Sequence, residues 1–219
     1  MQGMEKKEGC AMSYRVVEEF EAELCRYTGA RFAVTTNSCT MAILLACARL
    51  FDKKLRILAM DYDHPGRLNI EIPCRTYASV PMAVIHAGGA VRFVDIRWRG
   101  EYRLGGLNVW DSARRFTSGM YSAGQFQCVS FQTSKILGLE QGGAILHDNA
   151  EADTWLRRAR FDGRLNAEEK LPAMIGWHCY LNPSTAALGL QRLACLPRDN
   201  PDQAGSADFA DLSELPCFR

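Results

Sequence analysis

The sequence lacks any segment approaching the roughly 20 apolar residues that a membrane-spanning helix needs. The charged stretch Met1–Glu8 is not followed by an apolar core, so we expect no secretory signal peptide there. Charge of one sign is also lacking: 26 basic and 25 acidic residues are interspersed and give a net charge of +1. Because a nucleic acid or an anionic membrane needs a basic surface, we expect neither as a partner.

The chain has nine cysteines, but their spacing matches neither a disulfide framework nor a metal site. The count is odd and no Cys-x-x-Cys pair occurs. Cys25, Cys47, Cys128 and Cys195 lie within apolar patterns, where a free cysteine behaves as a small core side chain. These features predict a reduced compartment and a cytoplasmic location.

With 219 residues, of which 47% are hydrophobic, the chain can bury one sizeable core. Strand patterns alternate with helical ones, which is typical of an α/β fold with a mainly parallel sheet. We expect one domain over residues 1–196 and a turn-rich, loosely held tail over 197–219. Strands are expected at 31–35, 69–72, 90–96, 107–110, 126–131 and 144–146, and helices at 14–27, 40–50, 79–87, 151–161 and 183–196. A polar insert separates two of these elements at 61–67.

The most informative residue is Lys135, which follows the apolar run 126–131 and precedes the pair Gly142-Gly143. A lysine in a pocket at a strand end can be desolvated, and this lowers its pKa and frees the amine for Schiff-base chemistry. Asp111 ends another apolar run. A lysine with such an acid is what pyridoxal phosphate (PLP) requires. The alternatives are an exposed loop lysine and a solvated turn carboxylate.

Five short segments occur in an order that one enzyme family would show. They are Thr36–Thr40, Ile72–Tyr77, His86–Ile96, Asp111–Arg114 and Ser130–Lys135. Together they resemble the DegT/DnrJ/EryC1/StrS family of PLP-dependent sugar aminotransferases over about residues 13 to 196. The resemblance implies the large domain of a fold type I, aspartate aminotransferase-like enzyme, with helices on both faces of the central sheet.

The resemblance also implies roles for individual residues. Lys135 would hold the cofactor, Asp111 would contact its ring nitrogen, and the ring of Tyr77 would stack on it. The cofactor phosphate would be held by Ser38, Cys39, Thr40 and Ser130. Residues 38–40 open a helix, and its free N–H groups favour an anion. The alternatives are an ordinary N-cap at Ser38, core packing at Tyr77 and a polar strand end at Ser130.

Several positions depart from the family pattern. Cys39 replaces a glycine, Gln132 replaces a histidine, and Arg114 replaces a glutamine or histidine. Arg114 could bind the phosphate or a substrate carboxylate, or point to solvent. His178 replaces an asparagine that reaches the partner subunit's cofactor phosphate in the family, so a homodimer is implied. Family members carry a further C-terminal domain, and the resemblance implies that residues 1–219 would lack most of it.

The implied function is amino transfer to a nucleotide-linked keto-sugar, as in polysaccharide biosynthesis, from an amino-acid donor such as glutamate. An alternative is a non-catalytic PLP-fold subunit for binding or assembly, favoured by the departures at Cys39, Arg114 and His178. A PLP lyase or dehydratase is a third possibility. The family's dehydratases replace the lysine by histidine, so Lys135 argues against that branch. The sequence does not identify the sugar, the aminated carbon or the donor.

Overall fold

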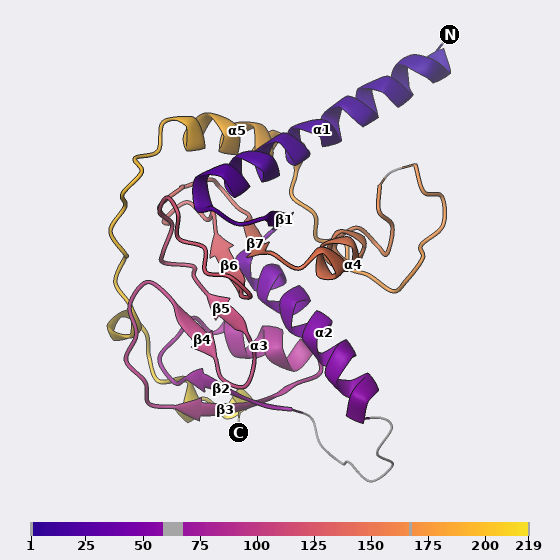
Figure 1. The fold of residues 1–219 in the computed structure, drawn as a ribbon. Coiled ribbons are helices and arrows are strands. Elements are labelled where there is room, and N and C mark those ends of the chain that lie inside the picture. The colour runs from indigo at the N-terminus through magenta and orange to yellow at the C-terminus, as the bar shows by residue number, and fades with distance from the viewer. Residues whose placement is uncertain (1, 59–67, 167, 219) are drawn as a thin grey trace.

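The computed structural model describes residues 2–58, 68–166 and 168–218 (Figure 1). The insert expected at 61–67 lies outside these residues. A five-stranded sheet has the order β1-β7-β6-β5-β4, and a separate two-stranded sheet pairs β2 with β3. The strands are β1 (Phe32–Thr36), β2 (Asn69–Pro73), β3 (Ala90–Val94), β4 (Tyr102–Leu104), β5 (Val109–Asp111), β6 (Phe126–Ser130) and β7 (Gly143–His147).

Five α-helices cover these sheets: α1 (Gln2–Thr28), α2 (Cys39–Leu58), α3 (Ser79–His86), α4 (Ala150–Arg160) and α5 (Pro183–Ala194). Their ends follow the sequence signals. Gly29 ends α1 with a φ of +82°, a conformation that glycine adopts without strain. Asn182 caps α5 by accepting a hydrogen bond from the N–H of Ser184, and Pro183 occupies the first turn. The expected helices are therefore present, and α1 and α2 are longer than predicted.

The α/β class is confirmed, but the pairing of neighbouring strands is not mainly parallel. Within the five-stranded sheet only β5 and β6 pair in parallel, whereas β7 runs antiparallel to both β1 and β6. The strand β4 adds a further antiparallel pair with β5. The strands β1 and β6 nevertheless run in the same direction, because each is antiparallel to β7. The strand β5 shares that direction because it is parallel to β6. Their carboxyl ends therefore meet at one edge.

Helices pack on both faces of the sheet, as predicted. Alternate residues of a strand point to opposite faces. On β6, Cys128 joins the cluster built on α2 and α3, whereas Val129 joins the cluster built on α1 and α5. On β7, Ile145 and Leu146 divide in the same way. In Figure 1, α1 and α5 lie together on one side and α2 and α3 on the other.

The cysteines are distributed largely as expected. Cys47 and Cys128 are buried in the core, and Cys25 is partly buried. Cys195 is an exception, because it forms the C-cap of α5 and is exposed. Its position in an apolar pattern is explained by the neighbouring Leu193, which is the residue that faces the core.

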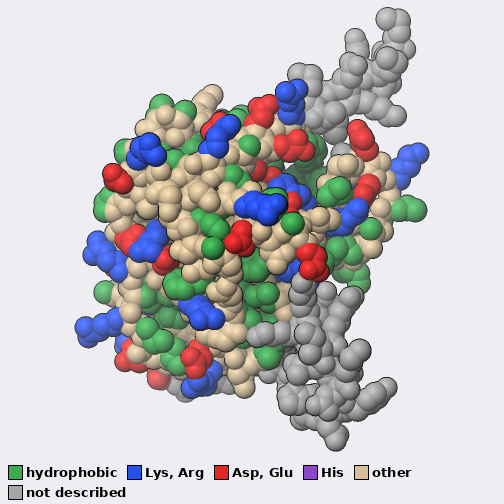
Figure 2. Space-filling view, in the orientation of Figure 1, with side chains coloured by type: hydrophobic (Ala, Val, Ile, Leu, Met, Phe, Trp, Pro, Cys, Tyr) green, Lys and Arg blue, Asp and Glu red, His purple; other side chains and the backbone are tan. Residues whose placement is uncertain are grey.

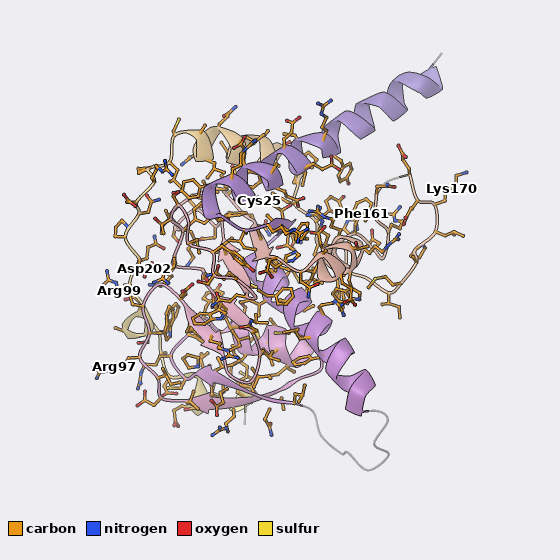
Figure 3. All side chains as sticks on the ribbon, viewed as in Figure 1. Cys25, Arg97, Arg99, Phe161, Lys170 and Asp202 are labelled. Carbon is orange, nitrogen blue, oxygen red and sulfur yellow. The ribbon has the colours of Figure 1, made fainter. Side chains whose placement is uncertain are left out.

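The tail, which the sequence predicts to be loosely held, is instead hydrogen-bonded along its length. The amide of Asn200 donates to the Oη of Tyr27 over 2.8 Å. The carboxylate of Asp202 pairs with Arg115, and its backbone carbonyl accepts from Arg99 over 3.0 Å (Figure 3). Three short 3-10 helices follow, at 206–208, 212–214 and 216–218. Hydrogen bonds and ion pairs to residues distant in the sequence fix this segment in place. Such contacts leave no local sequence pattern, so the sequence could not predict them.

The surface agrees with the balanced composition. Lysine, arginine, aspartate and glutamate side chains are interspersed on the face drawn in Figure 2, and neither sign forms a continuous field there. Within the described parts of the chain, no helix is both long and apolar enough to cross a membrane. The same residues contain no group of three or more metal-ligating side chains.

Candidate active site

The candidate site lies where strands of the five-stranded sheet end. Asp111 is the last residue of β5 and Ser130 the last of β6. Ser130 is opposite Gly143, which is in turn opposite Thr36 at the end of β1. The helix α2 begins three residues after Thr36. Open α/β sheets bind ligands at the carboxyl ends of their strands, and here three such ends and a helix N-terminus converge.

Asp111 is a buried carboxylate with fixed partners. Its side chain is 5% exposed. Oδ1 accepts a hydrogen bond from the N–H of Ala113 over 3.0 Å, and Oδ2 accepts one from the hydroxyl of Tyr102 over 2.8 Å. Burial raises the pKa of Asp111, and these hydrogen bonds, with the positive charge of Lys135, oppose that rise. A solvated turn carboxylate is therefore excluded.

Lys135 lies in the turn that follows β6 and is half-buried. Its N–H donates to the carbonyl of Gln132 over 2.8 Å, which fixes the turn. Burial lowers the pKa of the Lys135 amine, and the nearby Arg114 lowers it further, whereas Asp111 and Cys39 act in the opposite direction. A lowered pKa increases the neutral, nucleophilic fraction of the amine. The lysine and the acid singled out from the sequence thus interact electrostatically in the folded chain.

Three of the four residues predicted to hold the phosphate, Ser38, Cys39 and Thr40, lie at the start of α2. The Oγ of Ser38 accepts a hydrogen bond from the N–H of Met41 over 3.2 Å, so Ser38 does act as an N-cap. The side chain of Cys39 is buried, with its Sγ 3.6 Å from the carbonyl of Cys128. Thr40 shares a 2.7 Å hydrogen bond with the hydroxyl of Ser79, which ties the starts of α2 and α3 together.

Gly143 allows α2 to begin this close to the sheet. A Cβ at this position would lie 2.5 Å from the backbone nitrogen of Cys39 and 2.8 Å from its Cα. Real Cβ atoms do not approach backbone this closely, so any side chain at 143 displaces the first turn of α2. Gly143, the second glycine of the pair that follows Lys135 in the sequence, therefore has a steric role.

Substitution Gly143→Ala is expected to lower the free energy of unfolding by about 1–3 kcal/mol, which is the usual effect of overpacking a well-filled site. Urea denaturation of the wild type and the variant measures this difference. Equal midpoints and slopes would show that α2 yields at no cost and would contradict the steric role.

The remaining predicted residues occupy different surroundings. Ser130 is buried, and its Oγ accepts from the N–H of Gln132 over 3.5 Å. Tyr77 is 64% exposed, so it does not pack in the core. The side chain of His178 is 69% exposed, and its Nδ1 lies 2.9 Å from a carboxylate oxygen of Asp162.

Arg114 does not point to solvent. Its guanidinium donates to the carbonyl of Ala204 over 2.6 Å and pairs with the carboxylate of Asp208. The same group lies over the ring of Phe209, 4.7 Å from its centroid. Arg114 therefore connects the end of β5 to the tail, while remaining close enough to Lys135 to lower the pKa of its amine.

Two residues of the site have no role assigned from the sequence: Tyr102 carries no recognisable signal, and Thr76 lies in the family-like segment Ile72–Tyr77 without a predicted function. Tyr102 is buried on β4, and its hydroxyl contacts both Asp111 and Thr76. The strand β4 has only three residues, too few for an alternating pattern. Thr76 is buried between the half-buried Arg75 and the exposed Tyr77, and its role becomes visible only through its contact with Tyr102.

The chain matches the model of the DegT/DnrJ/EryC1/StrS aminotransferase family over residues 3–100 and 118–208. The match leaves out 101–117, the segment that contains β4, β5, Asp111 and Arg114. A comparison with curated protein sequences gives no match.

The fold is similar to several solved structures. One is the GDP-4-keto-6-deoxy-D-mannose-3-dehydratase of E. coli with bound hydrated PLP, at 18% identity and a TM-score of 0.67, over 83% of this chain and 60% of that one. The sugar aminotransferase CalS13 of Micromonospora echinospora has 18% identity and a TM-score of 0.64 with the same coverage. NtdA of Bacillus subtilis with bound cofactor PMP has 21% identity and a TM-score of 0.62, over 83% of this chain and 48% of that one.

At these identities the likeness establishes the fold, which agrees with the expected fold type I, aspartate aminotransferase-like large domain. The chain spans about half to three fifths of the length of these structures.

Proposed function

The chain belongs to the DegT/DnrJ/EryC1/StrS aminotransferase family, and from that premise we propose that it is a PLP-dependent aminotransferase. Its acceptor would be a keto-sugar in nucleotide-linked form, and its amino donor an amino acid such as glutamate. The observation that carries the proposal is that the half-buried Lys135 lies near enough to the buried Asp111 for the charge of each to act on the pKa of the other. The small-molecule substrates follow from the family premise.

The residues present fit the cofactor. A carboxylate has about four lone-pair sites, and Asp111 uses two of them, so it retains the capacity to bind a protonated ring nitrogen. Lys135 offers an amine with a lowered pKa. The first turn of α2, with the hydroxyls of Thr40 and Ser130, offers donors for a phosphate. The exposed ring of Tyr77 is available to stack on a pyridine.

When bound, PLP supplies an electron sink for bond cleavage at the donor's Cα. The chain's own residues would do the rest. Asp111 keeps its negative charge opposite the ring nitrogen, where a dry, fixed carboxylate is most effective. The Lys135 amine would first hold the cofactor and then, in its neutral form, would move the proton from the donor's Cα to the cofactor's C4′ carbon. Burial of Asp111 and half-burial of Lys135 would limit the access of water to the exchange.

Stoichiometry of the amino donor tests this function. Purified protein loaded with PLP is expected to release one equivalent of 2-oxoglutarate per site from glutamate alone. With a nucleotide-linked keto-sugar added, release is expected to become catalytic and an amino-sugar to accumulate. Mass spectrometry of both products measures the outcome, and PLP binding without any 2-oxoglutarate would contradict an aminotransferase.

A second candidate is a non-catalytic PLP-fold subunit that binds the cofactor or assembles with a partner. The observation that favours it is the engagement of Arg114, whose guanidinium is already paired with Asp208 and stacked on Phe209. An arginine held in this way is less available for a substrate carboxylate. The stoichiometric assay separates the two candidates, because this one predicts cofactor binding with no donor turnover.

A cytoplasmic location is proposed as well, and it is supported by the cysteines. Those that the structure describes are free, and five of them are buried: Cys39, Cys47, Cys74, Cys128 and Cys179. A role in polysaccharide biosynthesis would follow from an amino-sugar product.

A homodimer in which each subunit completes the other's site is a further part of the proposal. The segment that precedes His178 exposes two large apolar side chains, Leu171 at 81% and Ile175 at 90%. Apolar side chains exposed together favour an interface. Sedimentation at micromolar concentration is expected to give twice the 24.5 kDa mass of the chain, and a strict monomer would contradict it.

Substitution His178→Ala is expected to weaken PLP binding about ten-fold, because one hydrogen bond to a charged phosphate is worth roughly 1.5–3 kcal/mol. A fluorescence titration with PLP measures the change. His86→Ala is the matched control, since His86 is also exposed and lies at the end of α3. Equal affinities in the two variants would mean that His178 serves only its contact with Asp162.

A further inference from the structure

Tyr102 connects Asp111 to a second hydroxyl group. The phenol is buried, and its Oη donates to Oδ2 of Asp111 over 2.8 Å. The same Oη lies 2.6 Å from Oγ1 of Thr76. A phenol has one proton, and here it is directed to the carboxylate, so the threonine hydroxyl must donate to Tyr102. The three side chains form a directed chain of donors that ends on Asp111.

The surroundings of Tyr102 hold this chain in place. The indole of Trp98 packs on the phenol ring with 4.7 Å between centroids. The Nε1–H of Trp98 donates to the carbonyl of Arg75 over 2.9 Å, which fixes the indole. Burial and the charge of Asp111 raise the pKa of Tyr102 well above its ordinary value, so the phenol stays protonated and remains a donor.

Asp111 depends on such donors because burial opposes its charge. The charged and titratable groups that act on Asp111 or respond to it are Lys135, Arg114, Tyr102, Cys39 and Cys128. The positive charge of Lys135 is lost when its amine is neutral, and the guanidinium of Arg114 is already paired with Asp208. The N–H of Ala113 and the hydroxyl of Tyr102 then remain as the direct donors.

We propose that Tyr102 is a positioning residue that, with Thr76 behind it, keeps the Asp111 carboxylate ionised and directed at the ring nitrogen of the cofactor. The part of the inference that concerns the cofactor's ring nitrogen rests on the proposed function. The hydrogen bond itself is a property of the chain alone. Tyr102 and Asp111 lie outside the residues that match the family model, whereas Thr76 lies within them.

The test is Tyr102→Phe, which removes only the hydroxyl. In cofactor-free protein with ¹³C-labelled aspartate, the carboxyl resonance that disappears in Asp111→Asn reports the titration of Asp111. We expect this resonance to protonate at higher pH in Tyr102→Phe than in the wild type, because a hydrogen bond to the ionised form is lost. With PLP added, we expect the dissociation constant to rise about ten-fold, the effect of weakening one contact to a charged group.

Two further variants complete the test. Thr76→Val is expected to shift the Asp111 titration in the same direction by a smaller amount, and it serves in place of Tyr102→Phe if that variant does not fold. Tyr121→Phe is the matched control, since its hydroxyl donates to a backbone carbonyl of Gln125 instead. It is expected to leave both the titration and PLP affinity unchanged.

An unchanged Asp111 titration in Tyr102→Phe would overturn the inference, even if the variant were less stable, since a purely structural tyrosine would then account for it. If the Asp111 titration shifts in Tyr102→Phe but the wild-type protein binds no PLP, the cofactor and the proposed function are refuted. The hydrogen-bond chain from Thr76 through Tyr102 to Asp111 would still stand. The two failures are therefore distinguishable.

Discussion

Replacement of Lys135 by alanine is expected to lower the rate of amino transfer by about a thousand-fold or more. The substitution removes both the amine that holds PLP and the base that moves the proton at the donor's Cα. Positioned acid–base groups alone contribute about 10²–10⁴-fold. Single-turnover release of 2-oxoglutarate from glutamate measures the loss.

Lys135→Arg is the matched control for the charge. An arginine keeps the positive charge beside Asp111 but cannot be deprotonated in a protein, so it supplies no nucleophile. We expect this variant to be folded and as inactive as Lys135→Ala. If either variant retained the wild-type rate, another amine would carry the chemistry and the assignment of Lys135 would be wrong.

Asp111→Asn is expected to slow proton removal by about 10²–10³-fold, the usual effect of losing one preorganised electrostatic contact in a buried site. The amide has nearly the same shape but no charge to hold a proton on the ring nitrogen. Because burial raises the pKa of Asp111, the ionised carboxylate lowers the free energy of unfolding. The neutral amide is therefore expected to leave the free energy of unfolding unchanged or slightly higher.

Two measurements check this pair of effects. Rapid-mixing kinetics of the half-reaction with glutamate gives the rate, and urea denaturation gives the stability. A variant that reacts as fast as the wild type would remove Asp111 from the chemistry. A variant that fails to fold would show instead that the carboxylate and its bond to Tyr102 hold β4 against β5.

Much of the fold could be predicted because its signals are local. Asn182 and Pro183 specify the start of α5, and Gly29 specifies the end of α1. The runs that become β6 and β7 are mainly apolar and are buried along their whole length. The directions of neighbouring strands carry no such signal. The reversal of β7 and the addition of β4 depend on how distant segments meet.

The same distinction applies to the site. Lys135 and Asp111 could be identified because each ends or follows an apolar run at the sheet edge. The pairing of Arg114 with Asp208 joins residues 94 positions apart, and Tyr102 acquires its role only when β4 pairs with β5. Neither contact leaves a pattern in the sequence. The cofactor roles assigned to Lys135, Asp111, Tyr77 and His178 remain predictions, because they concern a cofactor and a subunit that the folded chain meets only on binding.

The most direct test of the central claim is to locate the covalent attachment of the cofactor. Wild-type protein incubated with PLP, reduced with borohydride and digested with trypsin is analysed by mass spectrometry. The pyridoxyl group is expected on Lys135, with loss of cleavage after that residue, because its amine combines burial with a lowered pKa. A cofactor label found only on other lysines, or no label at all, would contradict the account.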